Sequence, residues 1–263
     1  MRSRVDRVTR SAPSDRESVA MEGVRPEVVT EVPRRVLAVY AHPDDADVSC
    51  GGALATWASA GCTVELLVCT RGDKGSAVAL DDIEQLVERR DGEVAEAARR
   101  LGITAVRRLG LDDGSVENDL PLREAIVRVV RAVQPDVVVC PDPTAVFFGE
   151  HYVNHHDHRA VGWAALDAVA PAASSPLYFP GSGGAWSVST LYLSGSLDAN
   201  VVVDVSEQIE QKAKAVLCHE SQLGDAGDWL GVAVRERAEE LGRQAGVAFA
   251  ESFRRVQLGP PPP

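Results

Sequence analysis

Histidines and aspartates gather in two short segments of this chain. Residues 41–45 read Ala-His-Pro-Asp-Asp, and residues 154–159 read Asn-His-His-Asp-His-Arg. Adjacent carboxylates such as Asp44 and Asp45 repel each other unless a cation neutralises them or one is protonated. A helix cap would account for one of these carboxylates, but not for a pair beside His42. The first segment therefore indicates metal binding.

The second segment supplies further ligands of the same kind. Histidine and aspartate at tetrahedral geometry suit zinc, and catalytic zinc keeps three protein ligands and one open position. Two histidines and one carboxylate also suit Fe(II), so both metals stay open. A histidine-rich loop alone is typical of a solvated surface, but together with the first segment it favours a metal site. His151 and His156 are interpreted as loop residues outside that site.

Apolar runs and amphipathic stretches alternate along the chain. They predict, in order, strand 36–41, helix 51–60, strand 63–70, helix 83–101, strand 106–109, helix 120–133 and strand 136–140. This alternation predicts an α/β fold with a Rossmann-like, mostly parallel sheet and helices on both faces, in three layers. Ligands bind at the carboxyl ends of the strands of such sheets, and we expect both histidine segments at that edge.

The remaining segments are interpreted as loops, further elements and tails. We expect a long loop over 141–154, a helix beginning near Asp157 and a loop over 171–187. The pattern then predicts strands 190–193 and 201–205 and helices 206–219 and 232–246. We expect a single domain over 34–257, between disordered tails at 1–33 and 258–263, with Met1 or Met21 as the start.

Composition excludes several classes of protein. The 263 residues include 27 Lys and Arg against 39 Asp and Glu, which gives a net charge of −12. Nucleic acids and anionic membranes require a basic patch, so neither is expected as a partner. Five cysteines without framework spacing indicate reduced thiols and a cytoplasmic protein. No apolar run reaches the ~18 residues of a membrane span, and the first strand is not followed by the glycine-rich turn of a dinucleotide site.

Several motifs together resemble one enzyme family. They are AHPDD with Gly51-Gly52, the later His155-x-Asp157-His158, Thr70-Arg71-Gly72 with Gly75, the helix over 90–102, Lys212 with His219-x-Ser221-Gln222, and residues 250–254. The chain resembles the PIG-L/LmbE family of metal-dependent N-deacetylases over residues 35–255. Three positions depart from the family's pattern: Ala46 stands in place of Glu, His156 in place of Pro, and Val153 in place of Tyr, with Tyr152 one position away.

The resemblance implies a role for each matching residue. His42, Asp45 and His158 match the family's zinc ligands, and Asp44 matches the general base that takes a proton from the attacking water. The other matches are His155, which stabilises the oxyanion or protonates the leaving amine; Asp157, which orients an imidazole; and Arg71, Asp47 and His219, as substrate contacts.

These matches imply a zinc-dependent hydrolase that removes the N-acetyl group from an N-acetylated amino sugar or glycoside. Fe²⁺ is the alternative metal. An amidase of a mycothiol- or bacillithiol-type pathway, or of thiol conjugates, is one alternative. A non-enzymatic ligand-binding module on the same scaffold is another. The apolar residues 146–148 indicate a lid or a homo-oligomer interface.

Overall fold

An eight-stranded sheet forms the centre of the computed structural model, which describes residues 26–76, 82–223 and 227–259. Its strands are β1 (Glu27–Val29), β2 (Arg35–Tyr40), β3 (Thr63–Thr70), β4 (Ala105–Leu111), β5 (Val137–Pro141), β8 (Thr190–Ser194), β9 (Val201–Asp204) and β10 (Ala250–Gln257). The strand order is β1-β9-β10-β8-β5-β2-β3-β4. All pairs are parallel except those that β10 makes with β8 and β9. The mostly parallel sheet predicted from the sequence is therefore confirmed.

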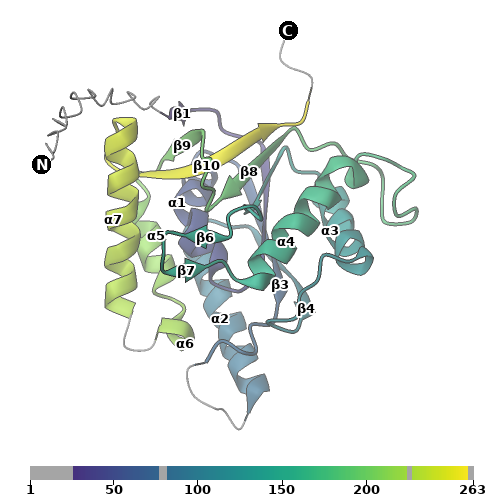
Figure 1. The fold of residues 1–263 in the computed structure, drawn as a ribbon, viewed down its shortest axis with the longest axis horizontal. Helices are drawn as coiled ribbons and strands as arrows, with labels where there is room; N and C mark the ends of the chain where they lie inside the picture. The colour runs from purple at the N-terminus through teal and green to yellow at the C-terminus, as the bar shows by residue number, and fades with distance from the viewer. Residues whose placement is uncertain (1–25, 77–81, 224–226, 260–263) are drawn as a thin grey trace, which may run out of the picture.

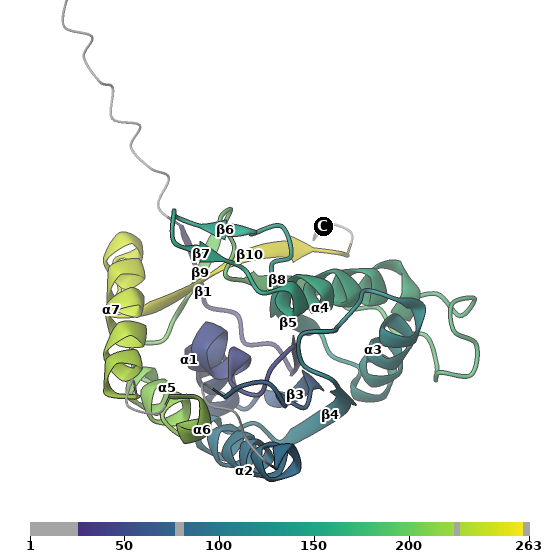
Figure 2. The same ribbon diagram turned by 60° about the horizontal axis from the view of Figure 1, so that its bottom comes forward.

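Helices cover both faces of this sheet (Figures 1 and 2). One face carries α1 (Asp45–Ser59), α2 (Ile83–Leu101) and α5 (Ile209–Val216), flanked by α6 (Glu220–Leu223) and α7 (Gly227–Ala245). The other face carries α3 (Leu120–Val133), α4 (His156–Asp167) and the π-helical turn η1 (Ala168–Ala173). Alternate residues of β2 enter the two cores: Val36 and Ala38 face α1, whereas Leu37 and Val39 face α3 and α4. A strand buried on both faces explains the continuous apolar run in the sequence.

Local caps explain why two helices have the predicted bounds. The Asp82 side chain accepts from the Gln85 amide at 3.1 Å and begins α2, which Gly102 ends at a φ of +76°. The Asp119 side chain accepts from the Leu122 amide at 2.9 Å and begins α3. Aspartate at the N-cap and glycine just beyond the last turn satisfy backbone groups that a helix leaves unpaired.

Other predicted bounds were wrong. β1 lies inside the expected tail 1–33, paired with β9, while residues 1–25 and 260–263 lie outside the described part. α1 begins at Asp45 rather than residue 51, with a non-helical Cys50 inside it. β10 was not predicted, and the hairpin of β6 (Phe147–Phe148) and β7 (Tyr152–Val153) lies within the expected loop 141–154. α5 is shorter than predicted, and α7 begins five residues earlier.

The position of β2 in the sheet determines where a site forms. The chain leaves β2 through α1 to β3 on one side, whereas β5 lies on its other side. A crevice forms beyond the carboxyl ends of two strands whose connections diverge in this way. The segments that follow β2 and β5 therefore meet at this crevice. No helix in the described part of the chain combines the length and apolar character needed to cross a membrane.

Candidate metal centre and active site

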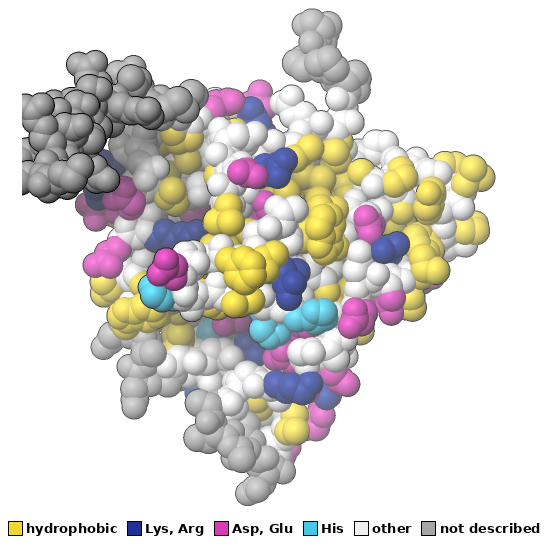
Figure 3. Space-filling model, in the orientation of Figure 1, with side chains coloured by type: hydrophobic (Ala, Val, Ile, Leu, Met, Phe, Trp, Pro, Cys, Tyr) yellow, Lys and Arg dark blue, Asp and Glu magenta, His cyan; other side chains and the backbone are white. Residues whose placement is uncertain are grey.

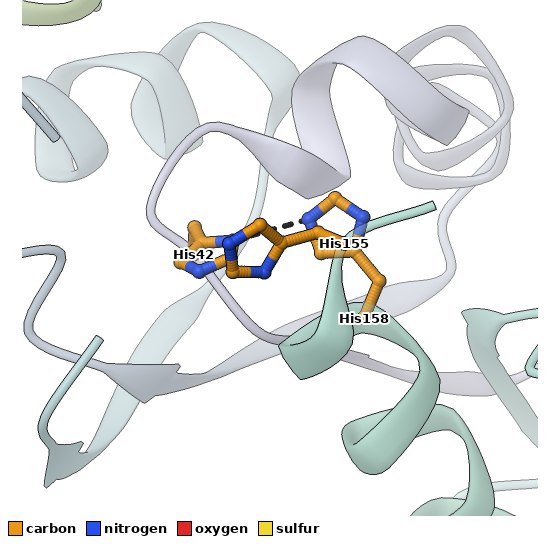
Figure 4. A group of neighbouring side chains, drawn as sticks. All are labelled: His42, His155 and His158. Carbon is orange, nitrogen blue, oxygen red and sulfur yellow. Dashed lines mark hydrogen bonds between the residues drawn. The ribbon is translucent and has the colours of Figure 1, made fainter. Parts of the chain in front are cut away.

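Three potential ligand side chains converge beyond the end of β2. His42 Nδ1 lies 3.1 Å from His158 Nε2 and 3.4 Å from Asp45 Oδ2, and His158 Nε2 lies 3.0 Å from Asp45 Oδ1. Atoms that bind one tetrahedral zinc ion at its usual bond lengths lie about 3.3 Å apart. The His42, His155 and His158 rings gather at this point, with His42 on the loop after β2 and the other two at the start of α4 (Figure 4). The spacing of the two imidazole nitrogens and the Asp45 carboxylate fits a small ion between them.

Hydrogen bonds orient both ligand imidazoles toward that point. His42 Nε2 lies 3.0 Å from Asp113 Oδ1 and 3.2 Å from Asp157 Oδ2, so Nε2 donates to these carboxylates and Nδ1 is the nitrogen that faces His158 and Asp45. His158 Nδ1 likewise donates to Asn154 Oδ1 at 3.1 Å, which leaves the Nε2 lone pair free. Carboxylate and amide partners of this kind orient metal-binding histidines. The donor set therefore fits a bound cation.

The electrostatics of the site also favour a cation. Burial lowers the pKa of His42, but its hydrogen bonds to Asp113, Asp157 and Asp45 outweigh burial and raise that pKa to about 12. Burial raises the pKa of Asp45, and the neighbouring His158 and His42 outweigh it and hold that pKa far below its usual range. The same carboxylates that favour a positive charge on the His42 ring would favour a metal ion at Nδ1 in place of its proton.

Asp44 does not act as a helix cap. It precedes α1, but its side chain makes no capping hydrogen bond, and Oδ1 instead accepts from Arg90 NH2 at 3.2 Å. Arg90 is only 2% exposed, and its NH1 donates to the Gly72 carbonyl at 2.8 Å. A Cβ at Gly72 would lie 2.2 Å from Arg90 NH1, and one at Gly75 would lie 2.3 Å from it. The two glycines of the TRG-x-x-G segment therefore leave room for the arginine that holds Asp44.

His155 presents a donor to the same cleft. Its Nδ1 accepts from the backbone N–H of Asp157 at 3.2 Å, which places the ring proton on Nε2. Burial, followed by the nearby His42 charge, lowers the pKa of His155 and keeps the ring neutral. Asp157 is fully buried and accepts from the amides of Gly114 at 2.6 Å and Val116 at 3.2 Å. His155 is thus a neutral donor, and Asp157 accepts a hydrogen bond from His42 Nε2.

The cleft has two arms that meet at Asp44, Asp45, Tyr152 and His158. The first, here called the Lys74 arm, has a volume of about 390 Å³ and is also lined by His42, Asp113 and His155. The second, the Arg237 arm, has a volume of about 560 Å³ and is also lined by Val48, Phe148, Leu230 and Arg237. Histidine side chains border a hydrophobic surface over β6 and β7 (Figure 3). The cleft can hold a ligand larger than an acetamide group.

Two predicted substrate contacts do not reach the cleft. Asp47 is 2% exposed and His219 is 1% exposed, and His219 Nε2 bonds Asp47 Oδ2 at 2.6 Å behind α1. The prediction was wrong for these two residues, because Asp47 lies on the inner side of α1. The third predicted substrate contact, Arg71, pairs with Glu84 at 2.8 Å and with Asp112 at 3.6 Å.

Asp113 and Arg90 belong to the site but were not predicted from the sequence. Asp113 stands in the turn after β4 with no histidine near it in sequence, and Arg90 looks like one charge of a solvated helix face. Asp113 could have been found only from its place after β4, because that strand ends at the same edge of the sheet.

Comparisons with known proteins agree with this geometry. Residues 37–169 match the family described as PIG-L: GlcNAc-PI de-N-acetylase. The chain belongs to the PIG-L family. The PIG-L match contains both histidine segments and the strands β2, β3, β4 and β5, whereas α7 and β10 lie beyond it.

Curated PIG-L relatives extend the comparison. The chain is 35% identical, over 179 residues, to a 1D-myo-inositol 2-acetamido-2-deoxy-alpha-D-glucopyranoside deacetylase of Saccharopolyspora erythraea, covering 59% of this chain and 62% of that protein. The chain thus spans less than two thirds of this relative. It is 29% identical, over 228 residues, to the diacetylchitobiose deacetylase of Thermococcus kodakarensis. That match covers 85% of this chain and 83% of that protein.

A solved structure shows the same fold. The N,N'-diacetylchitobiose deacetylase of Pyrococcus horikoshii, in complex with an inhibitor, superimposes with a TM-score of 0.78 at 28% identity, over 86% of this chain and 84% of that one. The likeness extends past the PIG-L match to the C-terminal part of the sheet.

Proposed function

We propose that this chain is a zinc-dependent hydrolase that removes the N-acetyl group from an N-acetylated amino sugar or glycoside. The observation that supports this most directly is the convergence of two imidazole nitrogens and Asp45 beside a carboxylate, Asp44, that has no capping role. A metal ligand set next to a carboxylate base is the arrangement that amide hydrolysis by water requires.

His42, Asp45 and His158 would hold the metal. When bound there, zinc polarises an amide carbonyl and lowers the pKa of a water molecule toward neutrality. Asp44 accepts a proton from the attacking water, while the hydrogen bond from Arg90 keeps its carboxylate in place. The Nε2–H of His155 donates to the carbonyl oxygen as negative charge develops on it. The proton that Asp44 took from the water then passes to the leaving nitrogen. The C–N bond breaks, and the products are acetate and a free amine.

The metal and the location in the cell are two parts of the proposal that the family assignment does not give. Zinc is proposed over Fe²⁺ because neither the donor atoms nor their spacing requires a redox metal, although the same set suits both. A cytoplasmic location is proposed because all five cysteines are free thiols, four of them buried.

The substrate class comes from the relatives. Two of them are named for N-acetylated glucosamine compounds, one an inositol glycoside and one a chitobiose. The identity to the inositol-glycoside deacetylase supports a second candidate, in which the same hydrolysis serves a thiol pathway. The two candidates differ in the group attached to the sugar, not in the chemistry.

Acetate release from three compounds tests the proposal: N-acetylglucosamine, N,N'-diacetylchitobiose and the inositol glycoside of N-acetylglucosamine. We expect zinc-loaded protein to release acetate from at least one, and chelator-treated protein to release none until zinc returns. Asp44→Asn should lower kcat by roughly 10²–10⁴-fold while it retains zinc, because it removes the base but no ligand. Full activity in Asp44→Asn or in stripped protein would contradict the mechanism. If the loaded protein released no acetate from any compound, a binding module would be the better interpretation.

A further inference from the structure

The Arg237 arm continues beneath α7. A second cavity, of about 190 Å³, lies between α7 and β10 and is lined by Lys212, Val234, Leu241 and Glu251 among others. Five residues line both spaces, so the two adjoin: Val48, Ser49, Gly195, Leu230 and Arg237. A ligand held at Asp45 and His158 can therefore extend toward α7, and Arg237 stands where the two spaces meet.

Arg237 differs from neighbouring arginines of α7. Arg235 pairs with Glu210 at 2.7 Å, and Arg243 pairs with Glu240 at 2.6 Å. Within residues 26–76, 82–223 and 227–259, no carboxylate or other hydrogen-bond partner engages the Arg237 side chain. Arg237 is an exposed residue of α7, so its guanidinium is accessible to a ligand.

The acidic groups near this channel are already engaged. Asp44 accepts from Arg90, and Asp45 lies between His42 and His158. Glu251 is buried, pairs with Lys212, and accepts from the amide of Ala53 at 2.7 Å. Arg237 is therefore the uncompensated charge among the described residues that line the two spaces.

The arm pairs this charge with apolar walls. Val48, Phe148 and Leu230 line the arm beside Arg237, whose own side chain is exposed and open to a ligand that enters the arm. A guanidinium presents paired N–H groups that match the oxygens of a carboxylate or phosphate.

We propose that Arg237 is a specificity residue that binds an anionic substituent, a carboxylate or a phosphate, on the part of the substrate that lies away from the scissile amide. This rests on the proposed function for the identity of the sugar. The substrate class becomes an acidic N-acetylated amino sugar derivative. Arg237 lies outside the residues 37–169 that define the family match.

Matched ligands and matched variants test the role of Arg237. The ligands are the carboxymethyl glycoside of N-acetylglucosamine, its neutral carboxamide, and N-acetylglucosamine 1-phosphate. The variant is Arg237→Gln, and the control is Arg243→Gln on the same helix. For the wild type we expect a KM about tenfold lower for whichever anionic compound fits than for the carboxamide, since one charged hydrogen-bond pair contributes roughly this much. Arg237→Gln should remove that difference by raising the KM of the anionic compound to that of the carboxamide, and Arg243→Gln should retain it.

Calorimetric binding of the corresponding amine products separates failure of this inference from failure of the proposed function. If an anionic product binds more tightly than its neutral counterpart and Arg237→Gln abolishes the preference, the inference holds even where no acetate is released. Equal affinities in the wild type, no binding of any product, or a preference that survives Arg237→Gln would overturn it. The carboxylate and phosphate compounds tell the two anions apart.

Discussion

At the scale of single residues, Asp113 and Asp157 share one nitrogen of His42. Their oxygens lie 3.0 Å and 3.2 Å from His42 Nε2. Asp157 also accepts two backbone N–H groups, whereas the Asp113 carboxylate reaches His42 from the turn after β4. Asp113 therefore links the turn after β4 to His42, one of the proposed metal ligands.

Asp113→Ala should weaken zinc binding by about 10–100-fold, the usual effect of removing a carboxylate behind a ligand histidine. The physical reason is that His42 loses an acceptor that fixes its tautomer and increases its basicity. Competition with a calibrated chelator measures the affinity. Asp112→Ala is the control, because Asp112 is exposed and contacts Arg71. An unchanged affinity in Asp113→Ala would show that Asp157 alone suffices.

Site residues that form short motifs could be predicted from the sequence. Those that only the fold brings next to the motifs could not. His42, Asp44 and Asp45 are adjacent, so their chemistry can be inferred before any fold is known. Asp113 stands alone in a turn, and its partner is 71 residues away. His219 was wrongly predicted for the same reason, because its burial against Asp47 depends on how α5 packs against α1.

At the scale of elements, the TRG-x-x-G segment after β3 and helix α2 form one unit around Arg90. Buried Arg90 of α2 donates to the Gly72 carbonyl and to Asp44, so it joins this segment to the start of α1. Gly72 has a φ of +65°, a conformation that L side chains rarely adopt. Both its conformation and its contact with Arg90 require the absence of a side chain.

Gly72→Ala should destabilise the fold and lower activity together. Gly61→Ala is the matched control, because Gly61 has a φ of +94° and no atom within 4 Å of an added Cβ. We expect a loss of about 1–2 kcal/mol in Gly61→Ala from backbone strain alone. A larger loss is expected in Gly72→Ala, because the methyl group also displaces a buried arginine. Urea unfolding measures both, and acetate release should fall only in Gly72→Ala. Equal behaviour of the two variants would refute the role given to Arg90.

Elements with strong local signals were predicted with the correct bounds. The sequence places α2 and α3 correctly because aspartate caps and apolar periodicity coincide there. β10 was missed because its sequence, AESFRRVQ, carries charges at several positions and pairs only with strands distant in sequence. β1 is three residues long, and its pairing with β9 joins segments that lie far apart in the chain.

At the scale of the whole molecule, the strand order explains why two segments 116 residues apart share one site. An alternation of strands and helices predicts a parallel sheet, but not which strands are neighbours. β5 pairs with β2 on the side opposite β3, and this arrangement brings the start of α4 to the loop after β2. The sequence placed both segments at one edge, and the strand order makes them neighbours.

Zinc should therefore stabilise the entire fold, because its ligands come from the loop after β2, from α1 and from α4. An ion that binds only the native state at 100 times its Kd adds about 2.7 kcal/mol. In a chain of this size that corresponds to a rise in Tm of roughly 5–10 °C, measured by calorimetry on chelator-treated protein before and after zinc. Asp44→Asn should keep the rise, since Asp44 is not a ligand, and His158→Asn should lose most of it. The comparison within each variant cancels any intrinsic change in stability. A full rise in His158→Asn would place the ion elsewhere and separate metal binding from the crevice at β2 and β5.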